Sequence, residues 1–215
     1  MRELHPDFQA ALNEATQRGI VPRKLMTVTG VSFPDGNGNV TSERLSFWSD
    51  DDTVDITVRS GLNNQISTRK FYGGVNLEVG NIVRSQNLVV QTVTVQMTAY
   101  APAVEQLVRG VDIRLARVEI WDALLDPKTR LMRGEPALAM LGVIDGSPIS
   151  TEAVDGAEVV ELKVVNEMMM MLTRTNPAKS SHEEQKKRVS SSGAVDNFGK
   201  YAGTTGVWKI PWGQK

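Results

Sequence analysis

An alternation of apolar and polar side chains with a period of two residues recurs along the chain, and it constrains the fold more than any other feature. Residues 54–58 and 160–164 place an aliphatic side chain at every second position. Residues 88–100 are mostly apolar at odd positions and rich in threonine at even ones. Successive side chains of a strand point to opposite faces, so this period predicts strands of an antiparallel sheet with one inward and one polar face.

The other elements are expected from the same kind of pattern. The apolar spacing after Pro6 and the stop at Gly19 predict a short amphipathic helix over 6–18. We expect strands at 25–33, 45–48, 54–58, 88–100, 111–120, 138–144 and 160–165, and a helical turn at 102–109. With roughly six to nine strands, the chain is expected to be mainly β, as an antiparallel β-sandwich or open barrel with a short N-terminal helix and an extended C-terminal arm.

The strand predicted at 111–120 changes its inward face part of the way along. Val111 and Ile113 keep one parity, whereas Val118 and Ile120 keep the other. A single extra residue in one strand of an antiparallel pair reverses the parity of everything after it. The sequence therefore predicts a β-bulge near Ala116.

Composition excludes several classes of function. The 215 residues contain no cysteine, so disulfides, thiolate metal sites and cysteine-ligated iron–sulfur clusters are ruled out. Lys and Arg (24) nearly balance Asp and Glu (25), which argues against nucleic acid as a partner. Neither an export signal nor an apolar run of membrane length is present, so we expect a soluble protein without a membrane partner.

The composition changes near residue 173, and we expect a β core domain over 1–172 and a C-terminal extension over 173–215. The extension is polar but carries spaced large side chains able to dock on another surface. We predict that five of them contact a partner: Phe198, Tyr201, Trp208, Ile210 and Trp212.

Little in the sequence points to catalysis. Histidine is the side chain most often used for acid–base catalysis, and the chain has two: His5 lies at the amino terminus and His182 in a charged run. Gly36 and Gly38 lack the third glycine of a phosphate loop, so a hairpin turn explains them better. We therefore expect no catalytic, cofactor-binding or metal-binding residue.

Three charged or unusual runs have a simple structural interpretation and a functional alternative. Residues 50–52 are three aspartates without the spacing of a calcium loop, so a charged loop is favoured over a cation site. Residues 168–171 are four methionines, expected to end a buried strand rather than to form an adaptable contact surface. Residues 186–188 are basic, but Glu183 and Glu184 offset their charge.

Two stretches of the chain resemble a known family. The first comprises residues 109–126, 140–146 and 159–165; the second comprises Arg174, residues 181–188 and 196–201, and Trp212 with Gly213. Together they resemble tail-tip and baseplate-hub proteins of lambda-like and related bacteriophages with long noncontractile tails. Several such proteins end in a cysteine-rich iron–sulfur segment, which a chain without cysteine cannot form.

The resemblance implies a non-enzymatic structural virion protein of the tail tip, assembled in the host cytoplasm. It would bridge the ring-forming tail subunits to the central hub or fibre, with the distal tail ring, the hub or fibre and the end of the tape measure as neighbours. Because tail tips are rotationally symmetric, the resemblance also implies a homotrimer, with a hexamer as the alternative.

Two other functions remain open at this point. A carbohydrate- or receptor-binding β-sandwich would use aromatic platforms, for which the sequence offers Trp48, Tyr72, Trp121, Trp208 and Trp212. A cell-wall hydrolase would need a pair of carboxylates in a cleft.

Overall fold

The computed structural model describes residues 4–83, 89–146, 149–150, 158–173, 182–189, 193–197 and 200. The chain divides into two compact units, Met1–Met171 and Leu172–Lys215, each considered by itself. The division does not test whether 1–172 folds without 173–215, so that expectation stays a prediction.

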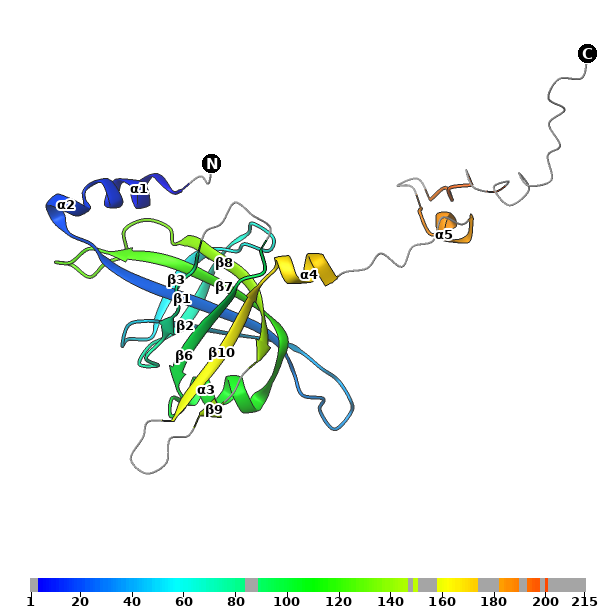
Figure 1. The fold of residues 1–215 in the computed structure, drawn as a ribbon, viewed down its shortest axis with the longest axis horizontal. Helices are drawn as coiled ribbons and strands as arrows, with labels where there is room; N and C mark the ends of the chain where they lie inside the picture. The colour runs from blue at the N-terminus through cyan, green and yellow to red at the C-terminus, as the bar shows by residue number, and fades with distance from the viewer. Residues whose placement is uncertain are drawn as a thin grey trace, which may run out of the picture. The chain divides into compact units, whose positions relative to one another are not determined.

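The described part of the first unit is built mainly from strands (Figure 1). The strands are β1 (Val21–Ser32), β2 (Ser42–Trp48), β3 (Val54–Arg59), β4 (Ile66–Tyr72), β5 (Glu78–Val79), β6 (Thr92–Thr98), β7 (Val111–Leu125), β8 (Ala137–Gly146), β9 (Ile149–Ser150) and β10 (Val159–Asn166). The helical segments are α1 (Pro6–Asn13), α2 (Ala15–Arg18), α3 (Pro102–Glu105) and the π-helix Gln106–Gly110, with α4 (Met168–Thr173) across the boundary and α5 (His182–Lys186) in the second unit.

All ten described strands belong to one sheet, in the order β3-β4-β2-β1-β7-β8-β10-β6-β5, with β9 paired to β10. The mainly β class and the short N-terminal helix are confirmed. The sheet is mixed rather than wholly antiparallel, because β4 returns from the β3–β4 hairpin to lie parallel to β2. β4 itself was missed from the sequence, since Lys and Arg interrupt its apolar pattern.

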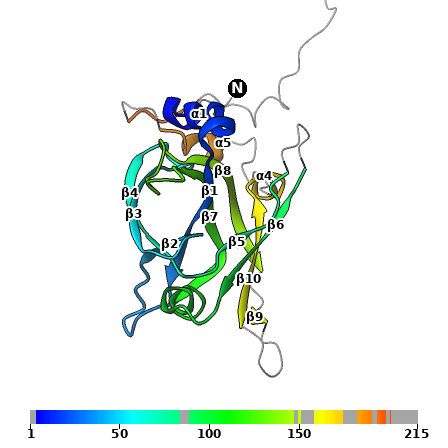
Figure 2. The ribbon, with the colours of Figure 1, turned by 90° about the vertical axis from the view of Figure 1, so that its left-hand side faces the viewer.

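The central strands β1 and β7 are buried on both faces. Met26 and Ile120, which are opposite each other in the ladder, point into a large core shared with β6, β10 and α3. Their neighbours Leu25 and Trp121 point the other way, into a smaller core closed by β3 and β4. Figure 2 shows β3 and β4 curving round one side of β1 and β7, with β6 and β10 on the other side.

The predicted bulge in β7 is confirmed. Its pairing with β1 shifts between Thr29 and Val31, so that residues 113–116 lie opposite Gly30 alone. Leu115 sits within the bulge at a φ of 57°, a left-handed conformation that is uncommon for leucine. The bulge lets Ile113 and Ala116 both face the large core, although their parities differ.

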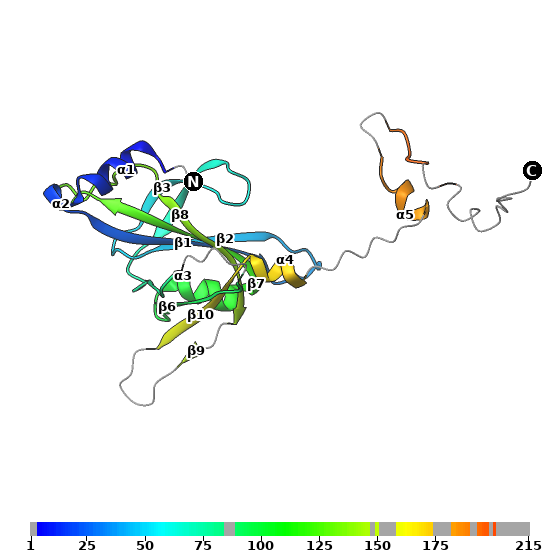
Figure 3. The same cartoon turned by 45° about the horizontal axis from the view of Figure 1, so that its top comes forward.

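The predicted N-terminal helix is confirmed with a break at Glu14, which separates α1 from α2. His5 caps α1 by accepting the backbone N–H of Asp7 on Nδ1, 3.3 Å away. Phe8 and Ala11 pack against Leu124 of β7. The helix therefore covers the end of the sheet where β1 begins and β7 ends (Figure 3).

The prediction for the methionine run was wrong. Residues 168–171 do not end a buried strand but begin helix α4, directly after β10. Met170 and Met171 are exposed. Methionine is a good helix former, and this propensity acts where no neighbouring strand pairs with the run.

We expect Gly30→Ala to destabilise the protein, because an added Cβ would lie 2.6 Å from Cγ1 of Val111 and 2.9 Å from the carbonyl oxygen of Asp112. Overpacking of this kind costs about 1–3 kcal/mol. Thermal unfolding followed by circular dichroism measures the loss. Gly36→Ala is the matched control, since nothing lies within 4 Å of an added Cβ there. Equal melting temperatures for the two variants would contradict the close approach of β7 to Gly30.

Candidate functional site

The smaller core ends in a layer of polar side chains. The pairing of β2, β1 and β7 places residues of the three strands in rows on the same face of the sheet. Three successive rows are Trp48, Leu25 and Trp121; then Ser46, Thr27 and Glu119; then Arg44, Thr29 and Arg117. The first row is apolar and buried, the second polar and buried, and in the third row both arginines are exposed. The second row therefore marks the border between a covered core and an open face.

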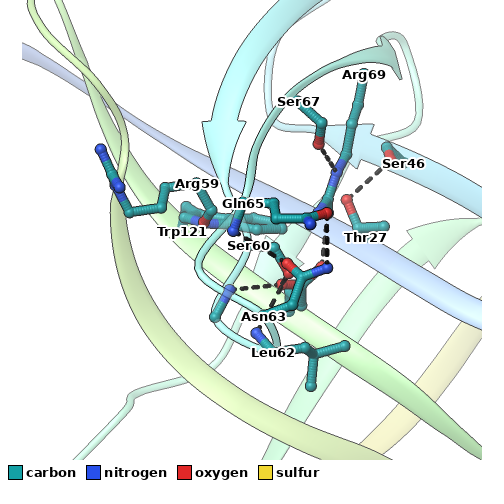
Figure 4. Close-up of polar contacts among 12 residues, drawn as sticks. Thr27, Ser46, Arg59, Ser60, Leu62, Asn63, Gln65, Ser67, Arg69 and Trp121 are labelled. Carbon is teal, nitrogen blue, oxygen red and sulfur yellow. Dashed lines mark hydrogen bonds and ion pairs between the residues drawn. The ribbon is translucent and has the colours of Figure 1, made fainter.

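A buried ion pair lies in the polar layer (Figure 4). Nη1 of Arg69 on β4 donates to Oε2 of Glu119 on β7 at 2.6 Å, and the two side chains are only 5% and 3% exposed. Oε1 of Glu119 accepts the Ser60 hydroxyl and the Gly61 backbone N–H, each at 2.8 Å. Charged groups so deeply buried require this degree of pairing and hydrogen bonding.

The same layer is tied to its surroundings by further contacts. The guanidinium of Arg69 lies over the Trp121 ring, 5.1 Å from its centroid, and Nε donates to the Ser67 hydroxyl at 3.2 Å. Nε1 of Trp121 donates to the carbonyl oxygen of Arg59 at 3.0 Å. These bonds join the β3–β4 hairpin to β7, strands that are not neighbours in the sheet. The layer therefore closes the smaller core.

A cavity of about 660 Å³ lies at the seam where the β3–β4 hairpin meets the start of β8. His5, Ser60 and Asn64 contribute to its wall, together with a bidentate pair in which Arg59 donates to Glu135 at 3.0 and 3.4 Å. The Ser60 hydroxyl donates to Glu119, and Nδ1 of His5 caps α1. The polar groups at this seam therefore fasten neighbouring elements together.

Beyond the polar layer, an open face extends onto the β1–β2 hairpin, which projects from the sheet (Figure 1). It carries four exposed apolar side chains: Val31 (46% exposed), Phe33 (54%), Val40 (54%) and Leu115 (49%). Three exposed arginines flank them: Arg44, Arg114 and Arg117. We call these seven residues the basic face.

The projecting hairpin has an ordered tip. The Asp35 carboxylate accepts the backbone N–H groups of Asn39 and Asn37, each at 2.8 Å. These two hydrogen bonds hold the pKa of Asp35 below its ordinary value. The tip thus places Phe33 and Val40 in a defined position at the end of the basic face.

The predicted partner contacts Phe198, Tyr201, Trp208, Ile210 and Trp212 lie outside the described residues. Trp48 and Trp121, considered as aromatic platforms, are buried in the smaller core and cannot stack on a ligand. In the second unit, Lys186 pairs with Glu183 at 2.9 Å and Lys187 with Glu184 at 2.6 Å. Two of the three charges of the basic run are therefore neutralised locally, as its sequence indicated.

Arg69 and Glu119 were not singled out from the sequence, although a usable signal exists. Glu119 has the same parity as the buried Trp121, and Arg69 has the same parity as the buried Phe71. A charged residue at an inward position of a strand requires a buried partner of opposite charge. The sequence does not reveal that partner, because 50 residues separate the two.

Comparison with known proteins adds no family assignment: no protein-family model matches the chain, and no curated sequence is significantly similar to it. Across the described ranges, no three His, Asp or Glu side chains are grouped so that they could hold a metal ion. Nor does this part of the chain contain a helix with the length and apolar character needed to cross a membrane.

We expect Glu119→Gln and Arg69→Met to destabilise the protein strongly, because each leaves an unpaired group in the polar layer. Losing one partner of a buried pair typically costs about 3–5 kcal/mol. Denaturant unfolding of both single variants and the double variant measures the cost and the coupling.

The exposed pair of Glu105 and Arg109, 3.7 Å apart, provides the control, and Glu105→Gln should change stability little. If the loss of unfolding free energy in the double variant equals the sum of the losses in the two single variants, Arg69 and Glu119 are not coupled and the interpretation of the layer is wrong.

Proposed function

We propose that this chain is a structural virion protein of the distal tail or tail tip of a siphophage, bridging the ring-forming tail subunits to the central hub or fibre during tail assembly. The observation that carries the proposal is the distribution of its side chains. Large apolar groups are exposed on a projecting hairpin, whereas the buried charged pair is used to close the fold. Exposed apolar groups gathered on one surface are a mark of sites at which proteins bind partners.

The resemblance to tail-tip and baseplate-hub proteins adds support. Residues 109–126, 140–146 and 159–165, on which the resemblance partly rests, form three neighbouring strands, β7, β8 and β10. The resemblance thus covers a contiguous part of the sheet. On this proposal the protein acts in the virion without chemistry of its own, and its neighbours are the distal tail ring, the hub or fibre and the end of the tape measure.

The proposal also includes a closed homo-oligomer, a trimer first and a hexamer second. Components around a tail axis share its rotational symmetry, and head-to-tail contacts produce such rings. Partner contacts by Phe198, Tyr201, Trp208, Ile210 and Trp212 belong to the same proposal. Burial of an interface tryptophan is commonly worth about 2 kcal/mol or more.

The proposal is tested in a phage whose genome encodes the chain. Changing Phe198, Trp208 and Trp212 together to Ala should leave the melting temperature of the purified protein nearly unchanged but prevent its incorporation into tails. Immunodetection on purified tails, together with plaque counts, provides the readout. The double variant His5→Ala and His182→Ala is the control and should support normal infectivity.

Two results would contradict the proposal. The first is the absence of the wild-type protein from purified tails. The second is a loss of infectivity in the histidine double variant with normal tail assembly, which would point to chemistry at those side chains.

A further inference from the structure

The basic face has more positive charge than its surroundings neutralise. Within the described residues, Arg44 and Arg114 have no ion-pair partner, and Arg117 is 4.0 Å from Glu167, the limit of an ion pair. The Asp112 carboxylate accepts the backbone N–H of Arg114 at 3.0 Å and supplies one negative charge. The face therefore combines an apolar centre with a positive border and fits an acidic surface.

The chain itself presents a matching acidic surface in the loop between β2 and β3. Asp50 is paired with Arg23 at 2.9 Å. Burial favours the neutral form of Asp50, but the Arg23 hydrogen bond, the Asp51 N–H and the charges of Arg23 and Arg130 together lower its pKa. Asp51 and Asp52 are exposed and, in the described part of the chain, form no ion pair.

The loop of residues 50–52, which we call the aspartate loop, is held in place through its backbone. Nε1 of Trp48 donates to the carbonyl oxygen of Asp52, and the backbone N–H of Gly74 donates to that of Asp50 at 2.9 Å. Gly73 packs so closely against the backbone of Asp51 and Asp52 that no side chain would fit there. The backbone that carries the two exposed carboxylates is thus held in place, which reduces the entropy lost when a cationic surface binds them.

The two surfaces lie at opposite ends of one strand. β2 begins at Ser42, next to the basic face, and ends at Trp48, directly before the aspartate loop. A strand of this length separates its ends by roughly 20 Å. One copy can therefore bind a second copy at each end with the same pair of surfaces.

We propose that the aspartate loop, residues 50–52, of one copy docks on the basic face of a second copy, so that the protein associates head to tail. This inference deepens the proposed function and rests on it for its setting in a ring. A symmetric dimer through the basic face would instead bring the arginines of two copies together, which like-charge repulsion disfavours. Head-to-tail contacts close into rings or continue as filaments.

Charge reversal tests the contact through two variants of the full chain. The face variant carries Arg44→Glu and Arg114→Glu, and the loop variant carries Asp51→Lys and Asp52→Lys. Each variant alone should associate at least tenfold more weakly than the wild type, because like charges then meet at every contact. An equimolar mixture should regain association, since each variant's altered surface is complementary to the other's.

Sedimentation velocity and mass photometry over a range of protein concentration provide the measurement, and added salt should weaken wild-type association. Asp55→Lys, on the exposed side of β3, is the control and should associate as the wild type does. A wild type that stays monomeric throughout, or a mixture no more associated than its separate components, overturns the inference.

The absence of native cysteine allows a second readout in assembled tails. Arg44→Cys and Asp52→Cys, placed together in one chain, should yield a ladder of disulfide-linked copies after mild oxidation, whereas each single variant yields dimers at most. Tails that contain the protein but give no ladder would overturn the head-to-tail contact and leave the proposed function standing. A ladder in solution with no protein in tails would contradict the proposed function and support the head-to-tail contact.

Discussion

The burial of β1 and β7 on both faces is the constraint on which the rest of the structure depends. Two adjacent strands with apolar side chains pointing both ways cannot lie at the surface, so the sheet must fold over them from both sides. It does so in opposite directions, with β3 and β4 over one face and β6 and β10 over the other. One continuous sheet thereby encloses two cores.

The polar layer decides where the smaller core stops. Glu119 and Arg69 are buried together, and the hydrogen bonds from Ser60 and Gly61 fix the β3–β4 hairpin against β7. A buried pair is a weak source of net stability, but losing either partner is costly because the other charge is then left buried and unpaired. Its effect here is to define a border: apolar packing on one side, and on the other an exposed face that is available for contacts between proteins.

This arrangement links the fold to the proposed role in a tail. A protein that joins larger components needs a rigid body and surfaces whose positions do not change on binding. The basic face and the aspartate loop lie near opposite ends of β2, and hydrogen bonds within the fold hold the hairpin tip and the backbone of the loop. The loop of three aspartates, interpreted from the sequence as a charged loop, is held through its backbone by Trp48 and Gly74.

The sequence by itself determined the local elements: the alternation marked most strands, the change of parity marked the bulge in β7, and the apolar spacing with the stop at Gly19 marked the first helix. These features depend on neighbours a few residues apart. Only the tertiary structure decided that β4 lies parallel to β2, that Trp48 and Trp121 are buried, and that Arg69 pairs with Glu119. Each of these depends on residues far apart in the chain, whose meeting is fixed by how the whole sheet folds over β1 and β7.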